Sequence, residues 1–194
     1  MKTLDPVILS GTTVRLEPYK DEHRAGVQQV ASDPRLWEVT VVRAYGEYFD
    51  SWWDDAHLGM KLGTRMPYAV ISQGDGTVIG STSYLNVALQ EQRLEIGSTF
   101  YAQNQWGTKV NPECKLLLMT YAFETLGIRR VEFCVDSINS RSRAAVTKLG
   151  AVQEGILRCH RNTYSGRRRD TVMFSVIDTE WPGVKRRLET RVNG

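Results

Sequence analysis

Residues 93–115, RLEIGSTFYAQNQWGTKVNPECK, have the types and spacing that could bind a phosphate group. An alternating apolar strand is followed by a polar loop and then by a helix with a well-marked start. Asn111 is a good N-cap, and Pro112 suits the first helical position. Backbone N–H groups at a helix start lack helical partners, and the helix dipole adds partial positive charge there. This segment therefore predicts an anion site.

A strand over 93–101 and a helix over 112–126 would form the walls of this site. The strand has the period-two apolar pattern of Leu94, Ile96 and Phe100. The Gly97–Ser98 pair within it indicates a local irregularity, such as a bulge. The helix carries an apolar stripe and ends before Gly127, which is a common residue after a helix.

The remaining elements favour an α/β (α+β) fold, with a mixed, mostly antiparallel sheet and helices on both faces. We expect a single domain over residues 1–194. The expected strands lie near 13–18, 67–72, 77–86, 130–136, 152–161 and 169–178, and the expected helices lie near 22–32, 46–62, 140–149 and 179–191.

Several segments resemble the GCN5-related N-acetyltransferases (GNAT), in particular their RimJ/RimL-like branch. The family signature, [Arg/Gln]-x-x-Gly-x-[Gly/Ala], falls on residues 104–109, where Gly107 alone matches strictly. The segment from Asn139 to Ser142, with Leu149-Gly150 after it, is similar to the family's Asn-x-x-Ser…Leu-Gly segment. Residues 14–18, 68–71, 78–80, 169–176 and 180–182 also resemble this branch, so the likeness extends over about residues 10–190.

The resemblance implies a V-shaped splay between the strands that end near residues 101 and 136. The arm of acetyl-CoA would lie in that notch, and its pyrophosphate would lie on the loop. The implied coenzyme-binding residues are Gly97, Ser98, Gln105, Trp106, Gly107, Thr108, Lys109, Val110, Asn111, Asn139 and Ser142. Lys109 stands where the family has a small residue, and it could either block the phosphates or point outward and attract them. Gly97 could equally serve only to permit a bulge.

Acetyl transfer to an amine needs a neutral amine and a means of protonating the departing thiolate. Glu95, on the strand that faces the implied notch, is the candidate for accepting the proton. It could instead be a structural carboxylate or bind the substrate amine. Ser142 is the candidate partner of the thiolate, with Asn139 holding the pantetheine arm. Both residues could instead serve only to start a helix.

An aromatic cluster before and within the second expected helix lies where the resemblance implies the acceptor wall. Its candidate substrate-binding residues are Trp37, Tyr45 and Trp52. Core packing is the alternative role for these side chains. The basic run at 167–169 follows Ser165-Gly166 and is read as the rim of a hairpin turn. A contact with acidic substrate, RNA or a coenzyme phosphate is the alternative.

Composition reduces the number of partner classes that the protein is expected to bind. The net charge of +3 is small and the basic run lacks interleaved aromatic residues, so nucleic-acid binding is not expected. Three separated cysteines and three scattered histidines suit neither a disulfide framework nor a metal site, so we expect no metal. Apolar runs are too short for a membrane span and the N-terminus lacks a signal-peptide pattern, which predicts a cytoplasmic protein with no membrane contact.

The acceptor remains open at this level. A RimJ/RimL-like enzyme would acetylate a protein N-terminal amine, whereas a related enzyme would acetylate an amino acid, a polyamine or an antibiotic. A noncatalytic coenzyme-binding or ribosome-associated module is a third possibility. The C-terminal segment has few large apolar residues, so a monomer and a weak homodimer are equally admissible.

Overall fold

A computed structural model describes residues 4–194. Within these residues, eight strands form one sheet in the order β1-β2-β3-β4-β5-β6-β8-β7. All neighbouring strands are antiparallel except β5 and β6, which are parallel. The strands are β1 (Leu9–Ser10), β2 (Val14–Pro18), β3 (Met66–Ser72), β4 (Val78–Ala88), β5 (Arg93–Tyr101), β6 (Arg130–Asp136), β7 (Val152–Asn162) and β8 (Arg168–Ile177).

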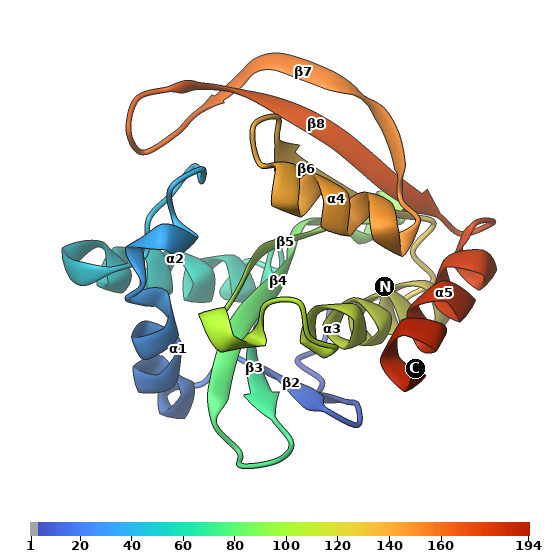
Figure 1. Ribbon diagram of the computed structural model, residues 1–194, viewed down its shortest axis with the longest axis horizontal. Helices are drawn as coiled ribbons and strands as arrows, with labels where there is room; N and C mark the ends of the chain where they lie inside the picture. The colour runs from blue at the N-terminus through green and yellow to red at the C-terminus, as the bar shows by residue number, and fades with distance from the viewer. Residues whose placement is uncertain (1–3) are drawn as a thin grey trace.

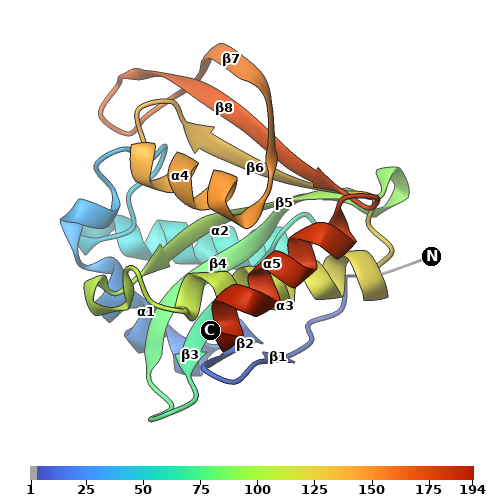
Figure 2. The ribbon, with the colours of Figure 1, turned by 45° about the vertical axis from the view of Figure 1, so that its right-hand side comes forward.

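Helices cover both faces of this sheet (Figures 1 and 2). One face carries α1 (Arg24–Ala31) and α2 (Phe49–Lys61). The other carries α3 (Val110–Thr120), α4 (Ser140–Leu149) and α5 (Trp181–Asn193), with α5 packed against α3 and α4. The long β7–β8 hairpin arches above α4 in Figure 1. None of the helices in the described part of the chain has the length and apolar character needed to cross a membrane.

Each face of the sheet has its own hydrophobic core, as strand alternation requires. On β3, Met66, Tyr68 and Val70 pack with α3, while Ala69 and Ile71 pack with α1 and α2. One core is thus a layer of alternate strand residues under α3, α4 and α5. The second is an aromatic layer under α1 and α2.

The irregularity predicted in the strand over 93–101 is a bulge in β5. The pairing of β4 with β5 shifts register between Ser81 and Ser83, opposite Phe100 and Gly97. Ser98 has φ +47, a left-handed conformation that is uncommon for a non-glycine residue. Because the extra residue reverses the alternation, Phe100 joins the α1–α2 core, whereas Leu94 and Ile96 belong to the other core.

The start of α3 differs from the sequence prediction. Asn111 is not the N-cap, because the helix already begins at Val110. The physical reason is Thr108, whose hydroxyl accepts from the Val110 N–H at 3.3 Å and begins the helix earlier. The Asn111 Oδ1 accepts instead from the Tyr101 hydroxyl at 3.2 Å. At its other end, α3 passes into a π-helical turn, Tyr121–Thr125.

Candidate functional site

A cleft of about 330 Å³ opens where β5 and β6 separate. The two strands are paired only from Arg93 to Glu95 and from Arg130 to Glu132. Beyond these residues β5 continues beside β4, and β6 continues beside β8. The β5 backbone that faces the cleft therefore has no strand neighbour, so its N–H and C=O groups are available to an extended ligand. The first turns of α3 and α4 complete the walls.

Gly97 and Ser98 both lie on the β5 wall of the cleft, and each residue contributes a different feature to it. A Cβ atom added to Gly97 would lie 2.9 Å from the Leu85 Cδ1 atom and 3.0 Å from the Glu95 Oε1 atom. Gly97 thus provides room, while Ser98 carries the unusual backbone conformation. The Arg65 Nη2 atom donates to the Ser98 hydroxyl at 3.2 Å, which fixes the bulge from outside.

The loop before α3 presents free backbone donors. The N–H groups of Gly107, Lys109 and Asn111 have no acceptor within residues 4–194. Gly107 has φ +78 and no atom near its missing Cβ, so it is required for its conformation rather than for space. These donors lie at the positive end of the α3 dipole, which is the arrangement that binds phosphate.

The side chains of this loop divide into two groups. Gln105 and Trp106 line the cleft together with Gly107 and Asn111, whereas Thr108, Lys109 and Val110 are not among the lining residues. Lys109 is exposed, so its long side chain does not fill the cleft.

Asn139 and Ser142 line the opposite wall, where α4 begins. Asn139 is the N-cap of α4, and its Oδ1 atom accepts from the Ser142 N–H at 3.0 Å. The helix-start role is therefore real, but it leaves the Ser142 hydroxyl without a hydrogen bond among the described residues. Arg141, between them, lies 3.9 Å from the ring centroid of Trp106 and connects α4 to the α3 loop.

Glu95 is buried on β5, with its carboxyl beside Gly97. Its Oε2 atom accepts from the Asn86 Nδ2 atom at 2.8 Å. Burial raises the pKa of the Glu95 carboxyl, against the opposing effects of its hydrogen bonds with Cys134 and Asn86. A raised pKa makes the carboxylate a better proton acceptor than an exposed one. Glu95 is not itself a lining residue of the cleft, so a proton would reach it at the edge beside Gly97.

Comparison with known proteins identifies this architecture. The family described as Acetyltransferase (GNAT) domain matches residues 13–152. The chain belongs to the GNAT family. The "Putative ribosomal N-acetyltransferase YdaF" of Bacillus subtilis is 31% identical over 112 residues, which are 57% of this chain and 60% of that protein. The match thus spans less than two thirds of this curated relative.

Two solved structures show the same fold over most of the chain. A GCN5-related N-acetyltransferase from Brucella melitensis is 30% identical, with a TM-score of 0.87, and the match covers 97% of this chain and 86% of that one. Mycobacterium smegmatis RimJ, in complex with CoA-disulfide, is 20% identical with a TM-score of 0.81, and the match covers 95% and 94% of the two chains. The second likeness concerns the fold alone. The splayed sheet expected of a GNAT fold is confirmed.

Lys115 and Cys134 also line the GNAT cleft, and the sequence analysis missed both. Lys115, on α3, is buried and lines the cleft one helical turn beyond Asn111. Cys134, on β6, lines it from the other side, and its thiol lies close to the Glu95 carboxyl. The four-residue spacing of Asn111 and Lys115 on one helix face was the available signal for the lysine. Nothing in the sequence around Cys134 indicates its place.

Burial has opposite consequences for these two groups. It lowers the pKa of the Lys115 ammonium to about 8 and, with the nearby Glu95 charge, raises the pKa of the Cys134 thiol to about 12. With this raised pKa, Cys134 stays protonated at neutral pH. Because only the thiolate is a good nucleophile, Cys134 is poorly suited to carry an acyl group. Lys115, in contrast, is partly neutral near pH 8.

The candidate acceptor residues lie in the α1–α2 core. Trp37 and Trp52 are buried there, and both rings contact Phe100. The Trp37 Nε1 atom donates to the Ala31 carbonyl oxygen at 2.8 Å. Tyr45 is half-buried against this core. None of these three residues lines the cleft, so their contact with an acceptor stays a prediction, while their packing role is evident.

The basic run over 167–169 is more than the rim of a turn. Arg167 donates to the buried carboxylate of Asp136 at the end of β6. Arg169 is buried, and its Nη2 atom donates to the Cys134 carbonyl oxygen at 2.9 Å. Two of the three arginines thus attach the β7–β8 hairpin to β6, and Arg168 alone is exposed.

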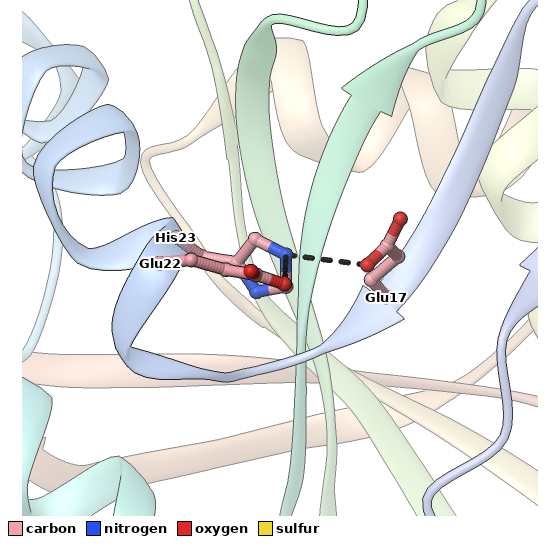
Figure 3. A group of neighbouring side chains, drawn as sticks. All are labelled: Glu17, Glu22 and His23. Atoms are coloured by element: carbon pink, nitrogen blue, oxygen red, sulfur yellow. Dashed lines mark ion pairs between the residues drawn. The ribbon is translucent and has the colours of Figure 1, made fainter.

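A further group of titratable side chains lies at the end of β2 and in the turn after it, and none of them lines the cleft (Figure 3). Glu17, Glu22 and His23 bring their ligand atoms within 4.8 Å of one another. The Arg15 Nε atom, however, lies 2.6 Å from the Glu17 Oε1 atom, and this ion pair lowers the pKa of Glu17. Because the buried carboxylate already has a cationic partner, the cluster has a sufficient explanation as an ion-pair network.

Proposed function

We propose that the protein is an acetyl-CoA-dependent N-acetyltransferase that transfers the acetyl group directly to an amine. The observation that carries this proposal is the meeting of two features in one cleft. An unpaired β5 edge lies next to a loop in which the N–H groups of Gly107, Lys109 and Asn111 have no acceptor in the described part of the chain. The edge fits the amide-containing arm of the coenzyme, and the loop fits its phosphates.

In this proposal the residues of the cleft divide the chemistry among them. The N–H groups of the α3 loop hold the pyrophosphate, and the β5 edge aligns the arm and polarises the thioester oxygen. Glu95 accepts the proton of the attacking amine, directly or through water, and its raised pKa suits that role. The Ser142 hydroxyl, free of other partners among the described residues, hydrogen-bonds the departing thiolate. The amine attacks in a ternary complex, without a covalent enzyme intermediate.

We favour the N-terminal amine of a protein as the acceptor. A relative named as a ribosomal N-acetyltransferase supports this choice. The reaction is also less demanding for such an amine. At pH 7 an α-amine is roughly one-tenth neutral, whereas a lysine amine is neutral in only about one molecule in 2,500. A small amine such as a polyamine is the second candidate, because a GNAT-fold neighbour from Vibrio cholerae is a spermidine N-acetyltransferase.

Calorimetric titration with acetyl-CoA tests the donor. We expect micromolar binding by the wild-type protein and its loss in Gly107→Trp, which obstructs the loop. Gly76→Trp is the matched control, because Gly76 also has a positive φ, +74 against +78, and open space at its Cβ position, but lies in the β3–β4 turn. Absence of wild-type binding at two temperatures would refute the proposal.

Coenzyme release with defined acceptors tests the amine. Three acceptors each offer a different amine. One is a short peptide without lysine and with a free N-terminus, the second is that peptide with its N-terminus acetylated and a lysine added inside it, and the third is spermidine. Turnover of the first peptide alone supports a protein N-terminal acceptor. Turnover of spermidine alone supports a small amine. Coenzyme binding without turnover of any acceptor, and with no effect of Glu95→Gln on biological activity, would favour a noncatalytic module.

A further inference from the structure

Lys115 is a buried cation with no charged partner among the described residues. Its side chain lies between α3 and β5 and is 5% exposed, yet it lines the cleft. No carboxylate within residues 4–194 forms an ion pair with it. Buried lysines are rare without such a partner, because removing an ammonium group from water is costly. The lowered pKa of Lys115 has the same physical cause.

The hydrogen bonds of Lys115 are incomplete. The Nζ atom donates to the Thr99 Oγ1 atom at 3.0 Å, and this is its one hydrogen bond among the described residues. The Thr99 hydroxyl also contacts the Thr82 hydroxyl at 2.8 Å and donates to the Gly97 carbonyl oxygen at 3.3 Å. The position of the Thr99 hydroxyl is therefore fixed by contacts within β4 and β5. An ammonium group has three N–H donors, so two of them remain for an acceptor in the cleft.

The place of Lys115 along the cleft indicates which acceptor would complete these bonds. Lys115 lies four residues after Asn111, roughly 6 Å further along α3 than the nearest N–H group without an acceptor among the described residues. Its anchor, Thr99, lies on the β5 wall beside the bulge. The phosphates belong at the loop, and the carbonyl groups of the acyl-pantetheine arm belong along β5. The distance therefore favours the arm over the phosphates.

We propose that Lys115 is a coenzyme-binding residue whose ammonium group donates to a carbonyl oxygen of the acyl-pantetheine arm. This inference rests on the proposed function, because it requires that the cleft bind acetyl-CoA. It adds a side chain to an interaction otherwise made by the strand backbone. It also explains why a lysine occupies a buried position where an apolar residue would cost less.

Two ligands separate the arm from the phosphates in a calorimetric test. Acetyl-CoA contains both parts, whereas adenosine 3′-phosphate 5′-diphosphate contains the phosphates without the arm. For Lys115→Met we expect acetyl-CoA to bind roughly 10- to 100-fold more weakly, as loss of a hydrogen bond to a charged group implies. Affinity for the nucleotide should change by less than about threefold. Lys148→Met, which removes an exposed lysine of α4 outside the cleft, should bind both ligands like the wild-type protein.

Thr99→Val provides a second variant with Lys115 in place. It removes the anchor of the ammonium group, and we expect a smaller loss of acetyl-CoA affinity, with nucleotide affinity again preserved. Thermal unfolding of each variant confirms that it is folded. Unchanged acetyl-CoA affinity in Lys115→Met would overturn the inference, and so would an equal loss for both ligands, because that would mean a general attraction of phosphate. If the wild-type protein bound neither ligand, the proposed function itself would fail.

Discussion

Glu95 is the residue on which the proposed chemistry most depends. It is buried on β5, hydrogen-bonded to Asn86 and close to Cys134. Its neighbour on the strand is Gly97, which lines the cleft and whose added Cβ atom would lie 3.0 Å from the Glu95 Oε1 atom. The same burial that raises its pKa also limits which amine can reach it.

We predict that Glu95→Gln lowers kcat by roughly 100-fold, the lower end of the usual contribution of a general base. The affinity for acetyl-CoA should change little, because Glu95 is not a lining residue of the cleft. Steady-state assays of coenzyme release with the best acceptor would measure kcat, and calorimetry would measure the affinity for acetyl-CoA. Glu91→Gln, an exposed carboxylate just before β5, is the control. An active Glu95→Gln variant would leave Glu95 a structural role only.

The pH profile gives a separate test of the same residue. The carboxylate form is the proton acceptor, and its pKa is raised above the ordinary glutamate value. Activity should therefore fall as the pH decreases through that raised pKa, so the acidic limb of kcat should lie above pH 4.5. This limb should be missing from the residual activity of Glu95→Gln. Its persistence there would assign the limb to another group.

Lys115 predicts a pH-dependent stability. Its pKa is lowered from 10.5 to about 8 in the folded protein, so between these values the unfolded chain binds more protons. Wild-type stability should therefore rise with pH relative to Lys115→Met. The relative gain between pH 7 and pH 9 should be about 1 kcal/mol in the free energy of unfolding. Urea unfolding of both proteins at the two pH values measures it, and a constant difference would mean that the pKa of Lys115 is not lowered.

At the scale of elements, the sequence predicted most of the frame. The strands over 93–101 and 130–136 and the helix over 140–149 have the predicted bounds, because period-two and helical patterns and caps specify them locally. The predicted start of α3 was wrong because Thr108 and Asn111 are both good capping residues. In the folded protein the Asn111 side chain accepts a hydrogen bond from Tyr101 instead. Cys134 could not be assigned, since its place depends on where two strands separate, whereas the four-residue spacing from Asn111 could have indicated Lys115.

The start of α4 allows its two roles to be separated. Asn139→Ala should lower the free energy of unfolding by about 1 kcal/mol through loss of the N-cap, and should also weaken acetyl-CoA binding. Asn139→Ser restores a capping oxygen but not the amide donor. If Asn139 contacts the coenzyme, the serine variant should regain stability without regaining affinity. Recovery of both, by chemical unfolding and calorimetry, would reduce Asn139 to a helix cap.

At the scale of the whole molecule, one buried carboxylate adds to the backbone pairing of β6 with β8 in attaching the β7–β8 hairpin. Asp136 ends β6 and contacts both Arg167 and Arg169. Asp136→Asn leaves these cations without their charge partner, so we expect a loss of roughly 3 kcal/mol in the free energy of unfolding. Asp50→Asn, which breaks the exposed pair with Arg24, should cost no more than about 1 kcal/mol. Similar costs for the two variants in urea unfolding would contradict this account.

The bulge at Ser98 also bears on how this family can vary in length. Because it adds one residue to β5, it determines that Phe100 faces one core and Tyr101 the other. Deleting a single residue between 96 and 100 would exchange these two side chains and turn Thr99 away from Lys115. Relatives that share both cores should therefore differ by substitution within this segment, and insertions or deletions should instead gather in exposed turns such as 73–77.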